Sequence, residues 1–171
     1  MTPQDFAPSS EREALCCFLD LQRAALVRKV AGVDDAAART TPTASALSLL
    51  GLLKHSALWE RRWFQVIVAG RTFAGEWPES EATGDEMDAE DFRVDERDTV
   101  SHWVAYFNEQ AAISREVTAD RERSARCAWP PLAERNLRWV LLHMIEETAR
   151  HAGHLDIARE LLDGQTGLGP R

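Results

Sequence analysis

Three residues in two separate segments carry the side chains best suited to bind a metal ion. His55 lies in a segment rich in leucine and tryptophan, whereas Glu147 and His151 lie four residues apart in a later one. On a helix of about 100° per residue, that spacing places Glu147 roughly 40° from His151. Two imidazoles and a carboxylate suit zinc, iron, nickel or manganese, and three protein ligands leave coordination positions open for water or a substrate thiolate.

The helical pattern predicts that both histidines are buried. Six apolar residues lie within roughly 40° of His151 on the helical wheel: Leu137, Val140, Met144, Leu155, Ala158 and Leu162. An ionised Glu147 beside this stripe is costly to desolvate unless a cation neutralises it. On the other segment, Ser48 and Gly51 share the face of His55, and their small side chains predict a cavity beside the imidazole.

Spacing alone leaves alternatives open. A histidine on an apolar face is often an ordinary core residue, and a glutamate four residues before a histidine is a common helical pair. His143 and His154 lie roughly 80° and 60° from His151 and compete with it as ligands, with His154 also placed to act from outside the ligand set. Arg62, roughly 10 Å along the axis from His55, has Glu60, Glu147 or a substrate carboxylate as possible partners, so a structural role and a substrate contact are both open.

The elements that position these residues are predicted to be four amphipathic helices. Apolar residues recur at spacings of three and four over residues 11–31, 45–70, 96–119 and 136–163. Residues 71–95 combine Gly and Pro with a run of acids and show no sustained periodicity, which predicts a loop. The pattern is typical of an all-α four-helix bundle with one long connection between its second and third helices.

Composition sets the class of protein. A chain of 171 residues fits one domain spanning residues 1–171, and a formal net charge of −8 opposes binding to nucleic acid. The longest uncharged apolar run, residues 46–53, is far shorter than the roughly 20 residues that cross a bilayer, and no export signal is evident. Cys16, Cys17 and Cys127 form no disulfide framework, which predicts the cytoplasm. Cys16 and Cys17 are interpreted as small core residues, and Cys127 lies in a presumed loop with no His or Asp nearby in the sequence to make it a nucleophile.

Two strings resemble a known family. They are LSLLGLLKHSALWERRWF, residues 47–64, and LRWVLLHMIEETARHAGHLDIARELLDG, residues 137–164. Both resemble the DinB/YfiT-like superfamily, in particular its uncharacterised actinobacterial branch near the mycothiol-dependent enzymes, and the resemblance covers most of the chain. It implies a four-helix bundle with a divalent metal near one end, and a homodimer.

The resemblance also implies a ligand set. Many members of the superfamily bind the metal with three histidines, whereas the mycothiol-dependent branch has a glutamate in place of the first of the histidine pair. This chain has the glutamate form, so His55, Glu147 and His151 are the implied ligands of a divalent ion, zinc first, with nickel, iron or manganese as alternatives. His154 stands where many relatives have glutamine, which implies contact with the ligated water, the substrate or Glu147. His154 and Arg62 are the residues we assign to the reaction.

The implied reaction is thiol transfer for detoxification. In such enzymes the metal binds the sulfur of a low-molecular-weight thiol, here mycothiol, and presents the thiolate to a small electrophilic substrate. One relative, maleylpyruvate isomerase, carries an additional C-terminal domain for which 171 residues leave no room, so we expect a transferase. A metal-dependent hydrolase of the same fold and a non-catalytic stress protein that binds a metal or ligand are the alternatives.

Overall fold

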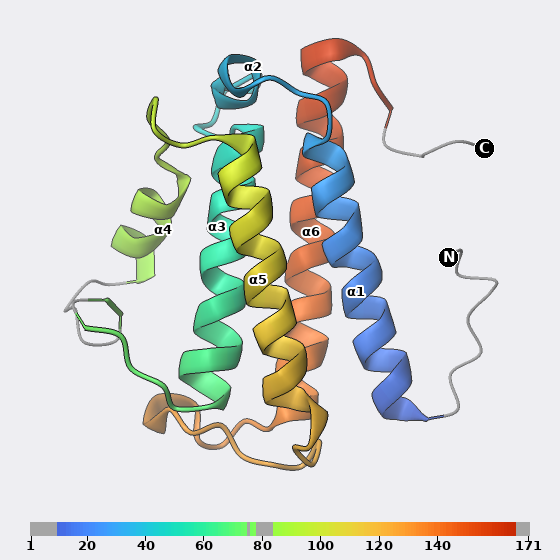
Figure 1. Cartoon of the computed structure of the whole chain (residues 1–171), viewed down its shortest axis with the longest axis vertical. Coiled ribbons are helices and arrows are strands. Elements are labelled where there is room, and N and C mark those ends of the chain that lie inside the picture. The colour runs from blue at the N-terminus through green and yellow to red at the C-terminus, as the bar shows by residue number, and fades with distance from the viewer. Residues whose placement is uncertain (1–9, 75, 78–83, 167–171) are drawn as a thin grey trace.

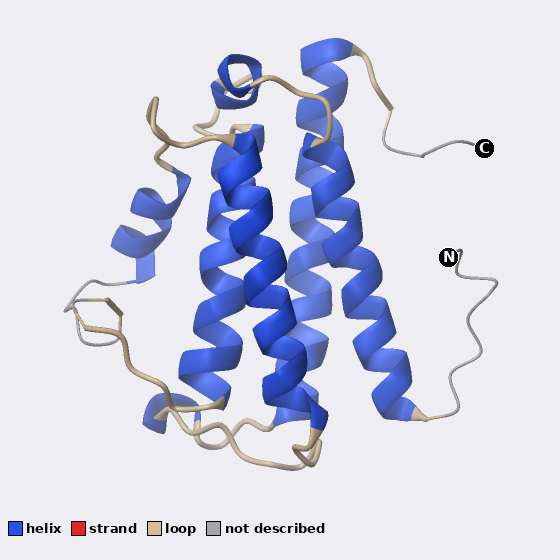
Figure 2. Cartoon of the chain, viewed as in Figure 1, coloured by secondary structure: helices blue, strands red, loops and turns tan. Residues whose placement is uncertain are grey.

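Four long helices form the body of the protein. The computed structural model describes residues 10–74, 76–77 and 84–166. The long helices are α1 (Glu11–Val30), α3 (Leu49–Arg61), α5 (Val100–Ala119) and α6 (Leu137–Asp163), and α3 runs on into a π-helical segment, Arg62–Val68. The connections contain the short helices α2 (Asp35–Arg39) and α4 (Gly84–Phe92) and a 3-10 turn, Pro130–Leu132. The predicted all-α four-helix bundle is confirmed (Figures 1 and 2).

Polar caps set where the long helices begin. The side chains of Ser10, Ser48, Thr99 and Asn136 each accept a hydrogen bond from the backbone N–H three residues further on, which satisfies a donor that the first turn leaves free. The predicted starts of the second and third long helices, at residues 45 and 96, were therefore wrong by one turn, because Ser48 and Thr99 are the residues that cap them. At the other end of α6, Gly164 adopts φ of 76°, the left-handed conformation that ends a helix.

The long helices pack in pairs. Helix α1 packs mainly against α6, and α3 packs mainly against α5 (Figure 1). One apolar cluster includes Leu26, Leu53 and Leu155, and a second includes Phe64 and Val140. Burial of these side chains is the main source of stability for helices of this length.

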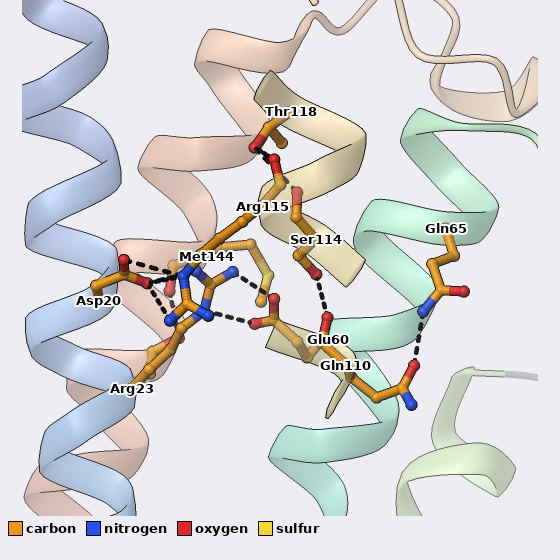
Figure 3. A network of polar contacts seen from close by, with 10 residues as sticks. Asp20, Arg23, Glu60, Gln65, Gln110, Ser114, Arg115, Thr118 and Met144 are labelled. Carbon is orange, nitrogen blue, oxygen red and sulfur yellow. Dashed lines mark hydrogen bonds and ion pairs between the residues drawn. The ribbon is translucent and has the colours of Figure 1, made fainter. Parts of the chain in front are cut away.

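A buried ion pair crosses the core between α1 and α3 (Figure 3). Arg23 Nε donates to Glu60 Oε2 at 3.2 Å, and a second nitrogen of the same guanidinium contacts the other carboxylate oxygen. Asp20 accepts from Arg23 and also from Arg115 on α5, so three helices share the network. Because both members of the central pair are at most 5% exposed, neither charge is solvated by water.

The long connection between α3 and α5 is the main departure from the sequence prediction. We expected a loop over residues 71–95, but α4 occupies its second half, and residues 78–83 lie outside the described residues. Met87 of α4 is buried, and Phe92 packs against the core, so tertiary contacts stabilise a helix whose acidic sequence gives it little amphipathic character. Among the described helices, none is both long and apolar enough to cross a membrane.

Candidate metal centre

A cavity of about 390 Å³ lies among α3, its π-helical extension, α6 and the last residue of α4. Its size falls within the usual range of small-molecule sites. Aromatic side chains form much of its wall, with Trp59 from α3, Trp63 from the π-helical segment and Phe92 from α4. The wider π-helical turn is a feature often found at functional sites.

The cavity brings the three predicted ligands together. His55, Glu147 and His151 all line it. The two imidazole rings lie edge to face, with centroids 4.9 Å apart, and Glu147 Oε2 lies 3.8 Å from His151 Nε2. Residues from two helices that are far apart in the sequence thus meet around one space, as the helical spacing predicts.

Both histidines are held in the neutral form. Burial lowers the pKa of His55 to about 3, with the nearby His151 and then Arg62 acting in the same direction. Burial also lowers the pKa of His151 to about 4, helped by His154 and Arg150. A neutral imidazole keeps a lone pair, which is the form that binds a metal ion.

The donor atoms fit a divalent ion. His151 Nδ1 is buried and, among the described residues, has no hydrogen-bond partner, which is the expected condition of a nitrogen whose partner is a ligand or water. The Glu147 carboxylate is 26% exposed at the edge of the cavity, where it can supply an oxygen ligand. Two imidazoles and one carboxylate are the donor set of many open zinc sites.

A second group of possible ligands overlaps the first. Atoms of His143, Glu146 and Glu147 all lie within 4.8 Å of one another, and within the described chain this is the one such group. The ligand atoms of His55, Glu147 and His151 are spread more widely than this 4.8 Å limit. The Glu147 carboxylate also accepts a hydrogen bond from Arg150 Nη1 at 2.9 Å. His143, which the sequence left open as a ligand, therefore shares Glu147 with the predicted set.

The predicted set has the more buried donors. His55 and His151 have side chains 9% and 15% exposed, against 23% for His143 and 55% for Glu146. The His143 ring also stacks on Trp139, with an interplanar angle of 11°. The imidazole donors of the predicted set are therefore shielded from water more completely than the donors of the second group.

The sequence model of a family described as mycothiol-S-transferase matches residues 14–164. This span contains both segments that supply the cavity. The chain belongs to the mycothiol-S-transferase family. No curated protein shows significant similarity to it.

The fold of this family member occurs in a solved protein of distant sequence. A crystal structure described as the conserved protein of locus from Enterococcus faecalis superposes with a TM-score of 0.61 at 17% sequence identity. The match covers 92% of this chain and 100% of the other. At this identity the likeness shows the fold alone.

The two residues assigned to the reaction lie outside the cavity wall. His154 has its ring centroid 6.1 Å from that of His151, one helical turn further along α6. Arg62 pairs with Asp91, with Nη2 3.0 Å from Oδ1 and Nη1 also in contact with Oδ2. The partners considered from the sequence for Arg62 were Glu60, Glu147 and a substrate, but Glu60 pairs with Arg23 instead.

Sequence reasoning missed the contribution of α4 to the site. The ring of Phe92 stacks on that of His55 at 4.3 Å and 13°, and Asp91 Oδ2 lies 3.8 Å from His55 Nδ1. Asp91 stands in a run of acids, and nothing in that run distinguishes it from its neighbours. A cavity does lie beside His55, as predicted, but Ser48 and Gly51 do not line it, because the backbone of Phe92 fills the space next to Gly51.

Proposed function

We propose that the protein is a metal-dependent thiol S-transferase that joins mycothiol to small electrophiles and so detoxifies them. The proposal is supported by the family match over residues 14–164 together with the cavity that His55, Glu147 and His151 line. Zinc is the first candidate for the ion, with nickel, iron and manganese as alternatives, since this donor set suits all four.

The metal would be held by His55 and His151 through neutral imidazole nitrogens and by Glu147 through its carboxylate. When bound, a divalent cation lowers the pKa of a thiol placed beside it, and the thiolate is the reactive form. In a substitution, the sulfur would form a bond to the electrophilic carbon, the bond from that carbon to its leaving group would break with its electron pair going to the leaving group, and the thiol proton would pass to solvent.

The other residues of the cavity exclude water and hold the ligands in place. Trp59 and Trp63 supply an aromatic wall, which favours an apolar or planar electrophile over water. His154 and Arg62 act on the ligand histidines rather than on the substrate. His154 lies next to His151, and Arg62 is bound to Asp91, which faces His55.

The nucleophile must come from a second molecule. None of the three cysteines lines the cavity. Burial raises the pKa of the thiols of Cys16 and Cys127, which makes them poorer nucleophiles at neutral pH. An external low-molecular-weight thiol therefore fits the site better than a covalent mechanism through the chain itself.

Adduct formation tests the function. Metal-loaded protein is incubated with mycothiol and monochlorobimane, and the fluorescent adduct is followed with and without a chelator. We expect thiol consumption and adduct formation that stop on chelation and return when metal is added. Adduct formation at the uncatalysed rate with metal-loaded protein would refute a transferase, and substrate hydrolysis without thiol consumption would indicate a hydrolase of the same fold.

We further propose a homodimer in the reducing cytoplasm. Ile157 and Leu161, one turn apart on α6, are both more than half exposed, and adjacent exposed apolar side chains support an interface between copies of the chain. Light scattering of the purified protein measures the mass directly. A single species of 19.2 kDa would contradict the dimer.

A further inference from the structure

Asp91 is a buried carboxylate that faces a predicted metal ligand from outside the ligand set. It is 3% exposed, and its Oδ2 lies 3.8 Å from His55 Nδ1. Two guanidinium nitrogens of Arg62 donate hydrogen bonds to the same carboxylate, one to each oxygen. This bidentate pair neutralises the charge of Asp91 and fixes the direction of its oxygens.

The ring of His55 is fixed from two further directions. Phe92 stacks on its face at 4.3 Å, and His151 meets it at right angles with centroids 4.9 Å apart. Rotation of the imidazole about its own axis is therefore restricted. The two contacts fix the plane of the ring, and in this plane Nδ1 faces Asp91.

Helix α3 itself holds the end of α4 in this place. A Cβ atom at Gly51 would lie 2.8 Å from the carbonyl oxygen of Phe92, so only glycine allows this approach of the two backbones. Lys54 Nζ donates to the carbonyl oxygen of Arg93 at 2.7 Å. The helix that carries His55 thus also carries the contacts that bring Asp91 and Phe92 onto it.

We propose that Asp91, held by Arg62, is a positioning residue that keeps His55 protonated on Nδ1 and so leaves Nε2 as the atom that binds the metal ion. A neutral imidazole donates from only one nitrogen, and a carboxylate beside that nitrogen selects the tautomer. A shift of less than about 1 Å turns the 3.8 Å contact into a hydrogen bond. The inference about the metal rests on the proposed function, whereas the inference about the tautomer concerns the protein alone.

The tautomer is measured without any substitution. Long-range ¹H–¹⁵N correlation spectra of the metal-free protein at neutral pH distinguish a protonated ring nitrogen from one that carries a lone pair. We expect His55 to be protonated on Nδ1 and to carry its lone pair on Nε2. The opposite tautomer in the wild-type protein overturns the proposal, whatever the protein does with metal.

Asp91→Asn is the matching variant. The amide is the same size but offers an N–H to His55 as well as an oxygen, so we expect the tautomer to shift and the dissociation constant for zinc to rise about 10- to 100-fold. Asp20→Asn is the control, since it also removes a carboxylate paired with arginine but does not contact His55. Zinc affinity is measured by competition with a chromogenic chelator, and folding is checked by circular dichroism.

The outcomes separate the two proposals. If the wild-type protein binds no metal, the proposed metal centre fails, and the tautomer spectrum still tests Asp91. If the wild-type protein binds zinc and Asp91→Asn binds it within about twofold of the same affinity, the role of Asp91 is refuted. If Asp20→Asn loses as much affinity as Asp91→Asn, the effect comes from general loss of stability, and the role of Asp91 is refuted as well.

Discussion

Acidification of the metal-free protein should reveal the buried histidines as a loss of stability. The folded protein holds the pKa of His55 at about 3 and that of His151 at about 4, whereas an unfolded histidine titrates near 6.5. As pH falls below 6.5, the unfolded chain takes up protons that the folded protein does not. Stability is therefore present above pH 6.5 and is lost progressively as the pH falls toward 4.

The size of the effect follows from proton linkage. Between pH 7 and pH 5 each histidine removes about 2 kcal/mol from the free energy of unfolding, or about 4 kcal/mol for the pair. The carboxylates whose pKa is lowered, such as Asp20, lose their contribution only at lower pH, so this window reports mainly on imidazoles. Burial also lowers the pKa of His143, which adds to the slope in the same direction.

Urea unfolding at a series of pH values measures this loss. The matched variant is His55→Gln/His151→Gln, which should lose about 4 kcal/mol less than the wild-type protein between pH 7 and pH 5. Between pH 8 and pH 9 both imidazoles are neutral in either state, and the two proteins should show parallel slopes. Parallel slopes between pH 7 and pH 5 as well would show that the histidines are solvated and would refute the electrostatic description of the site.

Further outcomes test the core, the docking of α4 and the bound ion. Glu60→Leu leaves the buried Arg23 guanidinium with Asp20 as its remaining carboxylate and should lower the free energy of unfolding by about 3 kcal/mol. Arg23→Met/Glu60→Leu should recover most of that loss, and an equal loss in both variants would contradict a true ion pair. Gly51→Ala should cost about 1–3 kcal/mol in thermal unfolding because its Cβ meets the carbonyl of Phe92, while Gly153→Ala, where the Cβ meets nothing within 4 Å, should be neutral or stabilising. Equal shifts in the two glycine variants would exclude close docking. Zinc at 100 times its dissociation constant should add about 2.7 kcal/mol of stability that a chelator removes, and an unchanged melting temperature would argue against binding to the folded state.

The long helices, and the meeting of His55, Glu147 and His151 at one cavity, were predictable because they depend on local patterns. Apolar spacing of three and four residues marks a helical face, and the same geometry places Glu147 and His151 one turn apart. His55 lies on the apolar face of its own helix, and this was enough to predict that it is buried in the same core as His151. These inferences need no knowledge of which helix packs on which.

The contribution of α4 was not predictable in this way. Asp91 and Phe92 reach His55 only because the chain crosses the bundle and returns to α3, and no local spacing encodes that contact. Gly51 shows the same limit, since a small residue beside a histidine predicts empty volume unless the backbone that fills it is known. The pairing of Arg23 with Glu60 likewise depends on how α1 packs against α3.

Metal content per chain is the most direct test of the central claim, which is that His55, Glu147 and His151 hold one ion. Elemental analysis after zinc loading and removal of free zinc should give one ion per chain in the wild-type protein and close to none in His55→Ala or His151→Ala, with most helicity retained in both. The ion should remain in His143→Ala and in His102→Ala, which replaces an exposed histidine of α5. Full metal content in His55→Ala and His151→Ala, with loss in His143→Ala, would contradict the proposed ligand set and place the ion at His143, Glu146 and Glu147 instead.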